Sequence, residues 1–114
     1  MDHRIELVIS LMKDDLRRDL SLGELAQAVN LSTSRFHHLF KAETGSTPAR
    51  YRQLLRMEKA RDILGTTHLS VRQVRTRVGL KDRSHFEREF KKVYGLTPVQ
   101  YRVAAFSSRQ RVEN

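Results

Sequence analysis

The apolar residues of this chain recur at the three- and four-residue intervals of amphipathic helices. One such pattern predicts an opening helix over about residues 2–16, and another predicts a long helix over 48–64 that ends at Gly65. No stretch alternates between polar and apolar residues as a half-buried strand does, so the pattern predicts helices alone. The apolar faces consist of Ile5, Val8, Ile9, Met12 and Leu16 in the first helix, and of Tyr51, Leu54, Leu55, Ala60, Ile63 and Leu64 in the long one.

The same pattern occurs twice along the chain. The two prolines, Pro48 and Pro98, lie fifty positions apart in the matching segments GSTPARYR and GLTPVQYR. Upstream the offset becomes 49, because one residue is inserted near Asp82. Two copies are too few for a solenoid, so this repeat indicates a duplicated supersecondary unit. The matching pairs include Ser21/Ser70, Leu25/Val74, Val29/Val78, Leu31/Leu80, Phe36/Phe86 and Phe40/Phe90.

Capping residues divide each copy into short helices. The segments SLGE from Ser21 and SVRQ from Ser70 fit the capping box that opens a helix. These helices end at Asn30 and Gly79, two residue types that tolerate the left-handed conformation of a tight turn. A second helix then begins after Ser32 or Asp82, ends at Gly45 or Gly95, and is followed by a helix that opens with Thr47-Pro48 or Thr97-Pro98. The second helices are predicted to bury Phe36, Leu39 and Phe40 in the first copy and Phe86, Phe90 and Val93 in the second.

Each copy is therefore a short helix, a tight turn and a second helix, which is the helix-turn-helix arrangement that reads the DNA major groove. The alternative is a plain helical bundle built by duplication. The outer faces of the second helices favour DNA, because arginine can bond guanine, glutamate can accept from cytosine N4, and serine can do either. These faces carry Ser34, His37, His38 and Lys41 in the first copy and Arg83, Ser84, Glu87, Arg88 and Lys91 in the second.

Composition narrows the choice of partner. The 22 Lys and Arg outnumber the 13 Asp and Glu, which gives a net charge of +9 and favours nucleic acid, with an acidic membrane surface next. A basic helical module that docks on a membrane or an acidic protein remains the alternative, with Arg50, Arg52, Arg56, Lys59 and Arg61 on the long helix.

Other function classes find little support. The absence of cysteine excludes a disulfide framework, a thiolate zinc site and a thiol nucleophile. There is no apolar run long enough for a membrane span, no signal-peptide pattern, no phosphate-binding glycine loop and no Ser-His-Asp set. His3, His37, His38, His68 and His85 have no zinc-site spacing. We expect a cytoplasmic protein that is not an enzyme and needs no metal or cofactor.

The segment GLKDRSHFEREFKKVYGLTPVQYR, over residues 79–102, closely resembles the signature of the AraC/XylS family of bacterial transcription regulators. Residues 21–52 resemble the family's first helix-turn-helix, and Arg56, Met57 and Ala60 resemble its linker. The resemblance implies an all-α domain of seven helices over 1–106, with one helix-turn-helix subdomain at about 4–47, a linker helix at about 48–65 and a second subdomain at about 66–106. Residues 107–114 are expected to form a polar, frayed tail.

The resemblance also implies a function. It predicts sequence-specific binding of double-stranded promoter DNA as a transcription regulator, with both recognition helices in successive major grooves of an asymmetric site. The domain would be monomeric on its own, would associate with the nucleoid when bound, and would act with RNA polymerase, as an activator or, alternatively, as a repressor. The effector, the target genes and the presence of a preceding effector or dimerisation domain stay open.

The resemblance also indicates which residues contact DNA. The resemblance places Thr33, Ser34, His37, His38, Lys41, Arg83, Ser84, His85, Glu87 and Arg88 at base-contact positions. The candidates for phosphate contacts are Arg50, Arg52, Lys81, Lys91, Lys92 and Arg102.

The sequence departs from the family pattern at Arg75, where the family has a small residue, as the first copy has in Ala26. The arginine either loosens the packing of the second subdomain or extends its charged end to water.

Overall fold

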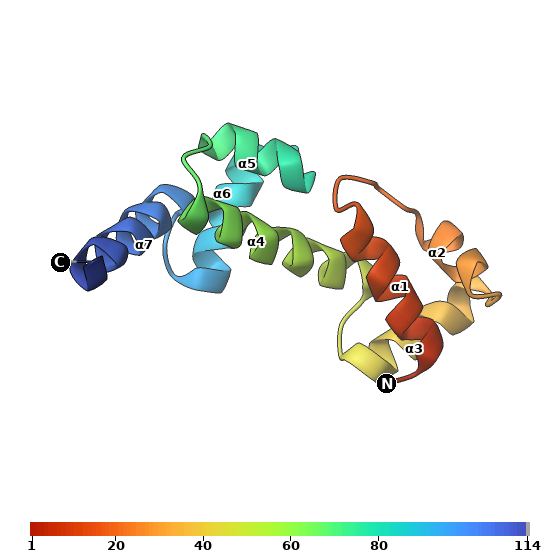
Figure 1. Ribbon diagram of the computed structural model, residues 1–114. Helices are drawn as coiled ribbons and strands as arrows, with labels where there is room; N and C mark the ends of the chain where they lie inside the picture. Colours follow the sequence, from red (N-terminus) through yellow and green to blue (C-terminus); the bar gives the residue numbers. More distant parts are fainter. Residues whose placement is uncertain (114) are drawn as a thin grey trace. The chain divides into compact units, whose positions relative to one another are not determined.

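The computed structural model describes residues 1–113, and these form seven α-helices and no strand (Figure 1). The all-α class and the two helix-turn-helix units predicted from the sequence are confirmed. The helices are α1 (His3–Asp14), α2 (Leu22–Ala28), α3 (Thr33–Thr44), α4 (Pro48–Thr66), α5 (Val71–Val78), α6 (Arg83–Tyr94) and α7 (Pro98–Glu113).

The chain divides into two compact units. The N-terminal unit spans Met1–Leu55, and the C-terminal unit begins at Arg56, so that α4 contributes to both. Each unit has its own apolar core. The buried residues of the N-terminal core are Ile5, Val8, Ile9, Met12, Leu25, Ala26, Val29, Phe36 and Phe40. Those of the C-terminal core are Met57, Ala60, Leu64, Val74, Val78, Leu80, Phe86 and Phe90.

A pair of phenylalanines organises each core. Phe36 and Phe40 on α3 have ring centroids 5.7 Å apart, and Phe86 and Phe90 on α6 repeat that separation. All four rings are fully buried. Each unit also has a helix outside the helix-turn-helix that covers the pair, α1 in one and the second part of α4 in the other. Burying two aromatic rings per unit is a large share of what so small a core can contribute to stability.

Side-chain caps fix the ends of the helices where the sequence predicts them. Ser21 and Glu24 form a complete capping box on α2, and Ser70 and Gln73 form one on α5. The backbone N–H of Arg35 donates to Ser32 Oγ over 3.2 Å. Asn30 and Gly79 adopt the left-handed conformation, with φ of 57° and 81°. The two turns are therefore closed by the same local chemistry.

Two apolar assignments in the second helices need correction. Val93 is 37% exposed and does not join the core. Tyr94, the next residue, packs there instead, with its ring centroid 4.8 Å from that of Phe90. The larger ring reaches the core from the last turn of α6, which leaves Val93 on the outer side. In the first copy Leu39 packs against the core while only partly buried.

Three helix ends also differ from the prediction. Helix α4 passes through Gly65 and ends at Thr66. A Cβ on Gly65 would lie 3.4 Å from the Tyr101 ring of α7, so the glycine lies at a contact between the two helices. This glycine permits a close approach between helices and does not terminate one. Helix α7 continues past Phe106 to Glu113, where a frayed tail was expected. The opening helix ends earlier than predicted, at Asp14, so Leu16 lies beyond it.

Side chains cap the C-terminal end of α4. Thr66 Oγ1 donates to the Asp62 carbonyl over 2.6 Å, and Thr67 Oγ1 donates to the Ile63 carbonyl over 2.8 Å. The next two carbonyls accept from arginines of α7: Leu64 from Arg102, over 3.1 Å, and Gly65 from Arg109. Side chains thus bond four consecutive carbonyls at this helix end, and the Ile63 carbonyl also accepts from the Thr67 backbone N–H over 3.0 Å. Arg109 lies beyond Phe106, so its bond connects the later part of α7 to the end of α4.

Candidate nucleic-acid interface

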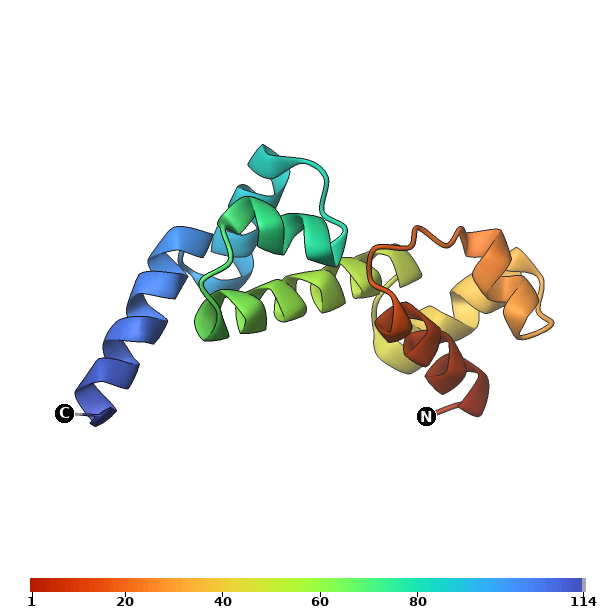
Figure 2. The same ribbon diagram turned by 45° about the horizontal axis from the view of Figure 1, so that its top comes forward.

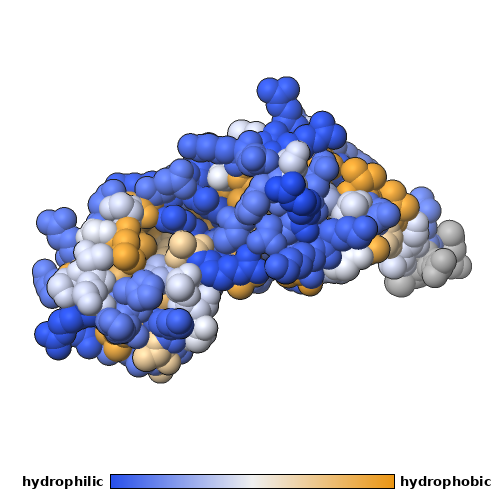
Figure 3. Space-filling model, turned by 180° about the vertical axis from the view of Figure 1, so that it is seen from behind, coloured by the Kyte–Doolittle hydropathy of each residue, from blue (hydrophilic) through white to orange (hydrophobic). Residues whose placement is uncertain are grey.

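The two second helices present similar polar faces on the side away from their phenylalanines. On α3 the exposed positions include Thr33, Ser34, His38 and Lys41, and on α6 they include Arg83, Ser84, His85 and Arg88. The core pairs Phe36/Phe40 and Phe86/Phe90 fix which face of each helix turns inward. Viewed from behind, the molecular surface is mostly hydrophilic, with apolar patches between polar side chains (Figure 3).

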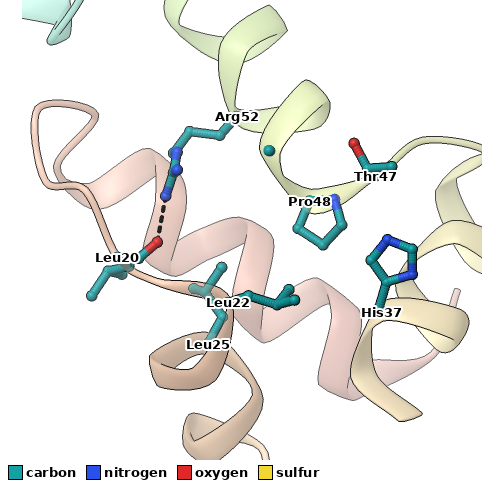
Figure 4. Close-up of a pocket in the computed structure, with 8 residues that line it drawn as sticks. Leu20, Leu22, Leu25, His37, Thr47, Pro48 and Arg52 are labelled. Carbon is teal, nitrogen blue, oxygen red and sulfur yellow. Dashed lines mark hydrogen bonds between the residues drawn. The ribbon is translucent and has the colours of Figure 1, made fainter. Parts of the chain in front are cut away.

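His37 and Glu87 occupy equivalent positions and are only partly exposed. His37 lines a pocket beside Pro48 and Leu22 at the start of α4 and α2 (Figure 4). Its imidazole is therefore set back toward the body of the N-terminal unit, more than its place on an outer face suggested. Base contact by His37 stays a prediction, and His38, which is exposed, is the stronger candidate of the two.

Glu87 is bonded within its own helix. The Arg83 Nε donates to Glu87 Oε1 over 3.1 Å, in an i,i+4 pair whose side chains are 78% and 41% exposed. So exposed a pair contributes little to stability, but it orients the Arg83 guanidinium along the helix surface. In this arrangement the carboxylate that was assigned to cytosine N4 accepts from Arg83.

Two of the phosphate candidates have partners inside the fold. Arg52 Nη1 donates to the Leu20 carbonyl over 2.6 Å, and Arg102 Nε donates to the Leu64 carbonyl over 3.1 Å. Both side chains are half-buried. Lys91 and Lys92 are exposed in the last turn of α6, which makes them better placed for a phosphate. Lys81 is exposed in the turn before α6, and Arg50 is half-buried near the start of α4.

Arg75 closes the turn of the C-terminal unit. Its Nη1 donates to the carbonyls of Leu80 and Lys81. These residues belong to the turn that connects α5 to α6, whose backbone can be followed in Figure 2. The backbone of the turn is unaffected: Leu80 N donates to Arg75 O over 3.0 Å, as Leu31 N does to Ala26 O. The charged end of the arginine thus bonds the turn itself, and this turn has the same backbone bonds as its counterpart.

The N-terminal ends of the recognition helices differ in charge. Asp82 accepts from the backbone N–H of His85 over 2.8 Å, and this bond lowers the pKa of the Asp82 carboxyl. The corresponding cap of α3 is the neutral Ser32. Within residues 1–113 no group of histidines and carboxylates is arranged to hold a metal ion. Nor is any described helix long and apolar enough to cross a membrane.

Comparison with known proteins finds similarity to transcription regulators. A family model described as a helix-turn-helix domain matches residues 25–104. The arabinose operon regulatory protein of Escherichia coli K12 is 33% identical over 103 residues, which are 90% of this chain and 35% of that protein. The transcriptional activator NphR of a Rhodococcus species is 38% identical over 99 residues, covering 87% of this chain and 29% of that protein. The chain thus spans about a third of the length of these relatives.

Solved structures share the fold. The DNA-binding domain of AdpA, in complex with a target DNA, matches with a TM-score of 0.87 and 25% identity over 96% of this chain and 98% of that one. An AraC-type regulator from Chromobacterium violaceum matches with a TM-score of 0.84 and 27% identity, over 90% of this chain and 91% of that one. Both matches extend over the two helix-turn-helix units.

Proposed function

The chain belongs to the AraC/XylS family of transcription regulators, and from that premise we propose that it binds double-stranded promoter DNA in a sequence-specific manner and regulates transcription. One observation carries the proposal. Two helix-turn-helix units each hold a second helix by a buried phenylalanine pair and leave that helix's opposite face polar and exposed. A rigidly held helix with an exposed polar face is what major-groove recognition requires.

The two faces have different chemistry, and this predicts an asymmetric site. Arg88 on α6 can bond the O6 and N7 atoms of guanine, whereas His38 occupies the equivalent position on α3. The two half-sites should therefore differ in sequence, and one chain should fill both. Selection of bound duplexes from a random pool tests this directly. Recovery of a palindrome that requires two chains would contradict the proposal.

The length of α4 sets the expected spacing. Its 19 residues measure about 28 Å, and successive major grooves on one face of DNA lie about 34 Å apart. We infer that each recognition helix occupies its own groove. Inserting about five base pairs between the half-sites turns them to opposite faces of the duplex, so affinity should fall to that of a single half-site. Unchanged affinity for the longer duplex would overturn the two-groove arrangement.

Binding should also depend steeply on salt. If about six phosphates are neutralised, the logarithm of the binding constant falls with the logarithm of salt concentration at a slope of roughly −5. Lys92→Ala should weaken binding to every sequence about equally, because a phosphate contact carries no base information. A gel-shift titration at several salt concentrations measures both effects, and a flat salt response would count against DNA as the partner.

Binding to vesicles of anionic lipid, compared with the gel shift of DNA, tests the membrane alternative. The basic residues of α4 do not form one exposed stripe, since Arg56 is only 7% exposed and Arg52 donates to the Leu20 carbonyl.

We propose a cytoplasmic protein that acts with RNA polymerase as an activator, as the name of NphR suggests for that relative. The isolated domain should occupy its site as a monomer, which sedimentation of the complex can measure.

A further inference from the structure

A pocket opens beside the recognition helix of the N-terminal unit. Its volume is about 330 Å³, and the residues that line it come from the start of α2, from His37 on α3 and from the start of α4 (Figure 4). Leucines and a proline, among them Leu22, Leu25 and Pro48, form its apolar wall. Its volume lies at the small end of the range for ligand sites, which limits the occupant to a small molecule.

The pocket has a positively charged group at its edge. Arg52 and His37 are the ionisable residues that line it, and no carboxylate is among the lining residues. The bond from Arg52 Nη1 to the Leu20 carbonyl fixes the guanidinium in place at the rim (Figure 4). A cation that is already oriented requires little further ordering when an anion binds. An apolar wall with a fixed cation at its edge is complementary to an apolar molecule that carries one carboxylate.

The equivalent groove of the C-terminal unit has different chemistry. It lies between the starts of α5, α6 and α7, and has Glu87 where the pocket has His37 and Val99 where the pocket has Ala49. Arg72, Arg75 and Arg83 also line it, and Arg83 pairs with Glu87. This groove therefore combines Val71 and Val99 with charged side chains and has an anion at the position of His37. The two copies provide a matched pair, of which the first has the more apolar lining.

We propose that the N-terminal pocket binds a small apolar carboxylate, with its hydrocarbon part against Leu22, Leu25 and Pro48 and its carboxylate beside Arg52. The pocket shares His37 and Arg52 with the candidate DNA contacts, and it contacts α3 through His37. Occupancy of the pocket is thereby linked to the helix proposed to recognise DNA. Binding of the carboxylate itself does not depend on the proposed function.

Three probes with the same apolar group test the proposal: 3-phenylpropionate, 3-phenylpropanol and 3-phenylpropylamine. Each is titrated into the protein while backbone amide shifts are recorded by NMR. The acid should bind at least fivefold more tightly than the alcohol, the amine should bind most weakly, and the shifts should centre on Leu22, Leu25 and His37. Equal binding of acid and alcohol would overturn the assignment of a carboxylate. Absence of shifts at these residues at millimolar probe would overturn the site.

A pair of substitutions locates the binding. Ala49→Phe fills the pocket from an exposed position on α4, so it should reduce affinity for 3-phenylpropionate at least tenfold and leave the fold intact. Val99→Phe makes the matching change in the C-terminal groove and should leave affinity unchanged. Equal loss of affinity in both variants, or loss in neither, would contradict the proposal.

A short acidic peptide with one leucine is the competitor. If it binds more tightly than 3-phenylpropionate, the pocket is a protein-docking site and the small-molecule proposal is wrong.

A DNA titration separates this inference from the proposed function. If 3-phenylpropionate binds and the protein shows no preference for any duplex, the pocket stands and the DNA function fails. If the protein selects a duplex site and the acid produces no shifts, the function stands and the pocket proposal fails.

Discussion

The two units use one framework and differ in the side chains placed on it. Both have a phenylalanine pair at 5.7 Å, a complete capping box and a left-handed residue in the turn. Two of the differences lie at exposed positions, where Asp82 replaces Ser32 and Arg88 replaces His38, and a third replaces the buried Ala26 by the half-buried Arg75. The comparison teaches that the buried pairs and caps fix the helix-turn-helix geometry. The outer residues are then free to differ, which gives each unit its own recognition chemistry.

Removing a buried phenylalanine ring should produce the largest difference in stability between the two units. Phe40→Ala and Phe90→Ala each delete a fully buried ring, so each should lower the free energy of unfolding by about 3–5 kcal/mol. The loss should be confined to one unit, because the buried residues of each core come from that unit alone. Hydrogen exchange of backbone amides, resolved by residue, measures it. Equal loss of protection in both units would show that they unfold together.

The recognition residues should separate the two units in DNA binding. Arg88→Ala should cost about 1–3 kcal/mol on the preferred duplex and relax the preference at one base pair, because a bidentate contact to guanine is lost. His38→Ala, at the equivalent position of α3, should cost less. Affinities for matched and mutated duplexes measure both changes. Arg88 would not be a base-reading residue if its removal weakened binding to every sequence alike.

The two turns should lose different amounts of stability when arginine and alanine are exchanged at positions 75 and 26. Arg75→Ala removes the bonds to the Leu80 and Lys81 carbonyls and should destabilise the C-terminal unit by about 1 kcal/mol. Ala26→Arg should be more harmful, since Ala26 is 1% exposed and an arginine there has no space in the core. Urea denaturation of the two variants compares them. A stability gain in Arg75→Ala would revive the idea that this arginine loosens the unit.

The smallest expected difference between the two units is in how their helix caps respond to acid pH. The pKa of Asp82 is lowered chiefly by the hydrogen bond from the His85 backbone N–H, so its ionised form stabilises the folded state. That stabilisation is present above the ordinary carboxyl pKa, 3.8, and is lost as pH falls through the lowered pKa of the folded protein. The amide shift of His85 should therefore titrate below the ordinary value. Arg35, capped by Ser32, should show no such titration, and Asp82→Ser should make the two caps alike.

Local sequence patterns were sufficient for most of the fold. The capping boxes, the left-handed turn residues and the phenylalanine spacing depend on residues only a few positions apart, so the sequence displays them directly. Long-range contacts could not be predicted in this way. Gly65 has the usual character of a helix terminator, and only its closeness to Tyr101 reveals a packing role.

The candidate site shows the same limit. Exposure of Ser34, Ser84 and Arg88 follows from helical periodicity, because the neighbouring phenylalanines fix the inward face. The partners of Arg52 and Arg102 lie 32 and 38 residues away in the sequence, so nothing local distinguishes these arginines from surface charges. His37 is set back by a pocket to which three helices contribute, and no single helix pattern encodes it.

The capped end of α4 has a consequence for the order of folding on the ribosome. The carbonyls of Leu64 and Gly65 accept from Arg102 and Arg109, which are synthesised 38 and 44 residues later. The N-terminal unit, by contrast, has every residue of its core once position 55 has emerged. Since domains fold as they leave the ribosome, the N-terminal unit should become protease-resistant on nascent chains that still lack α7. The end of α4 must wait for those last arginines, so the two copies of one motif should mature at different moments of translation.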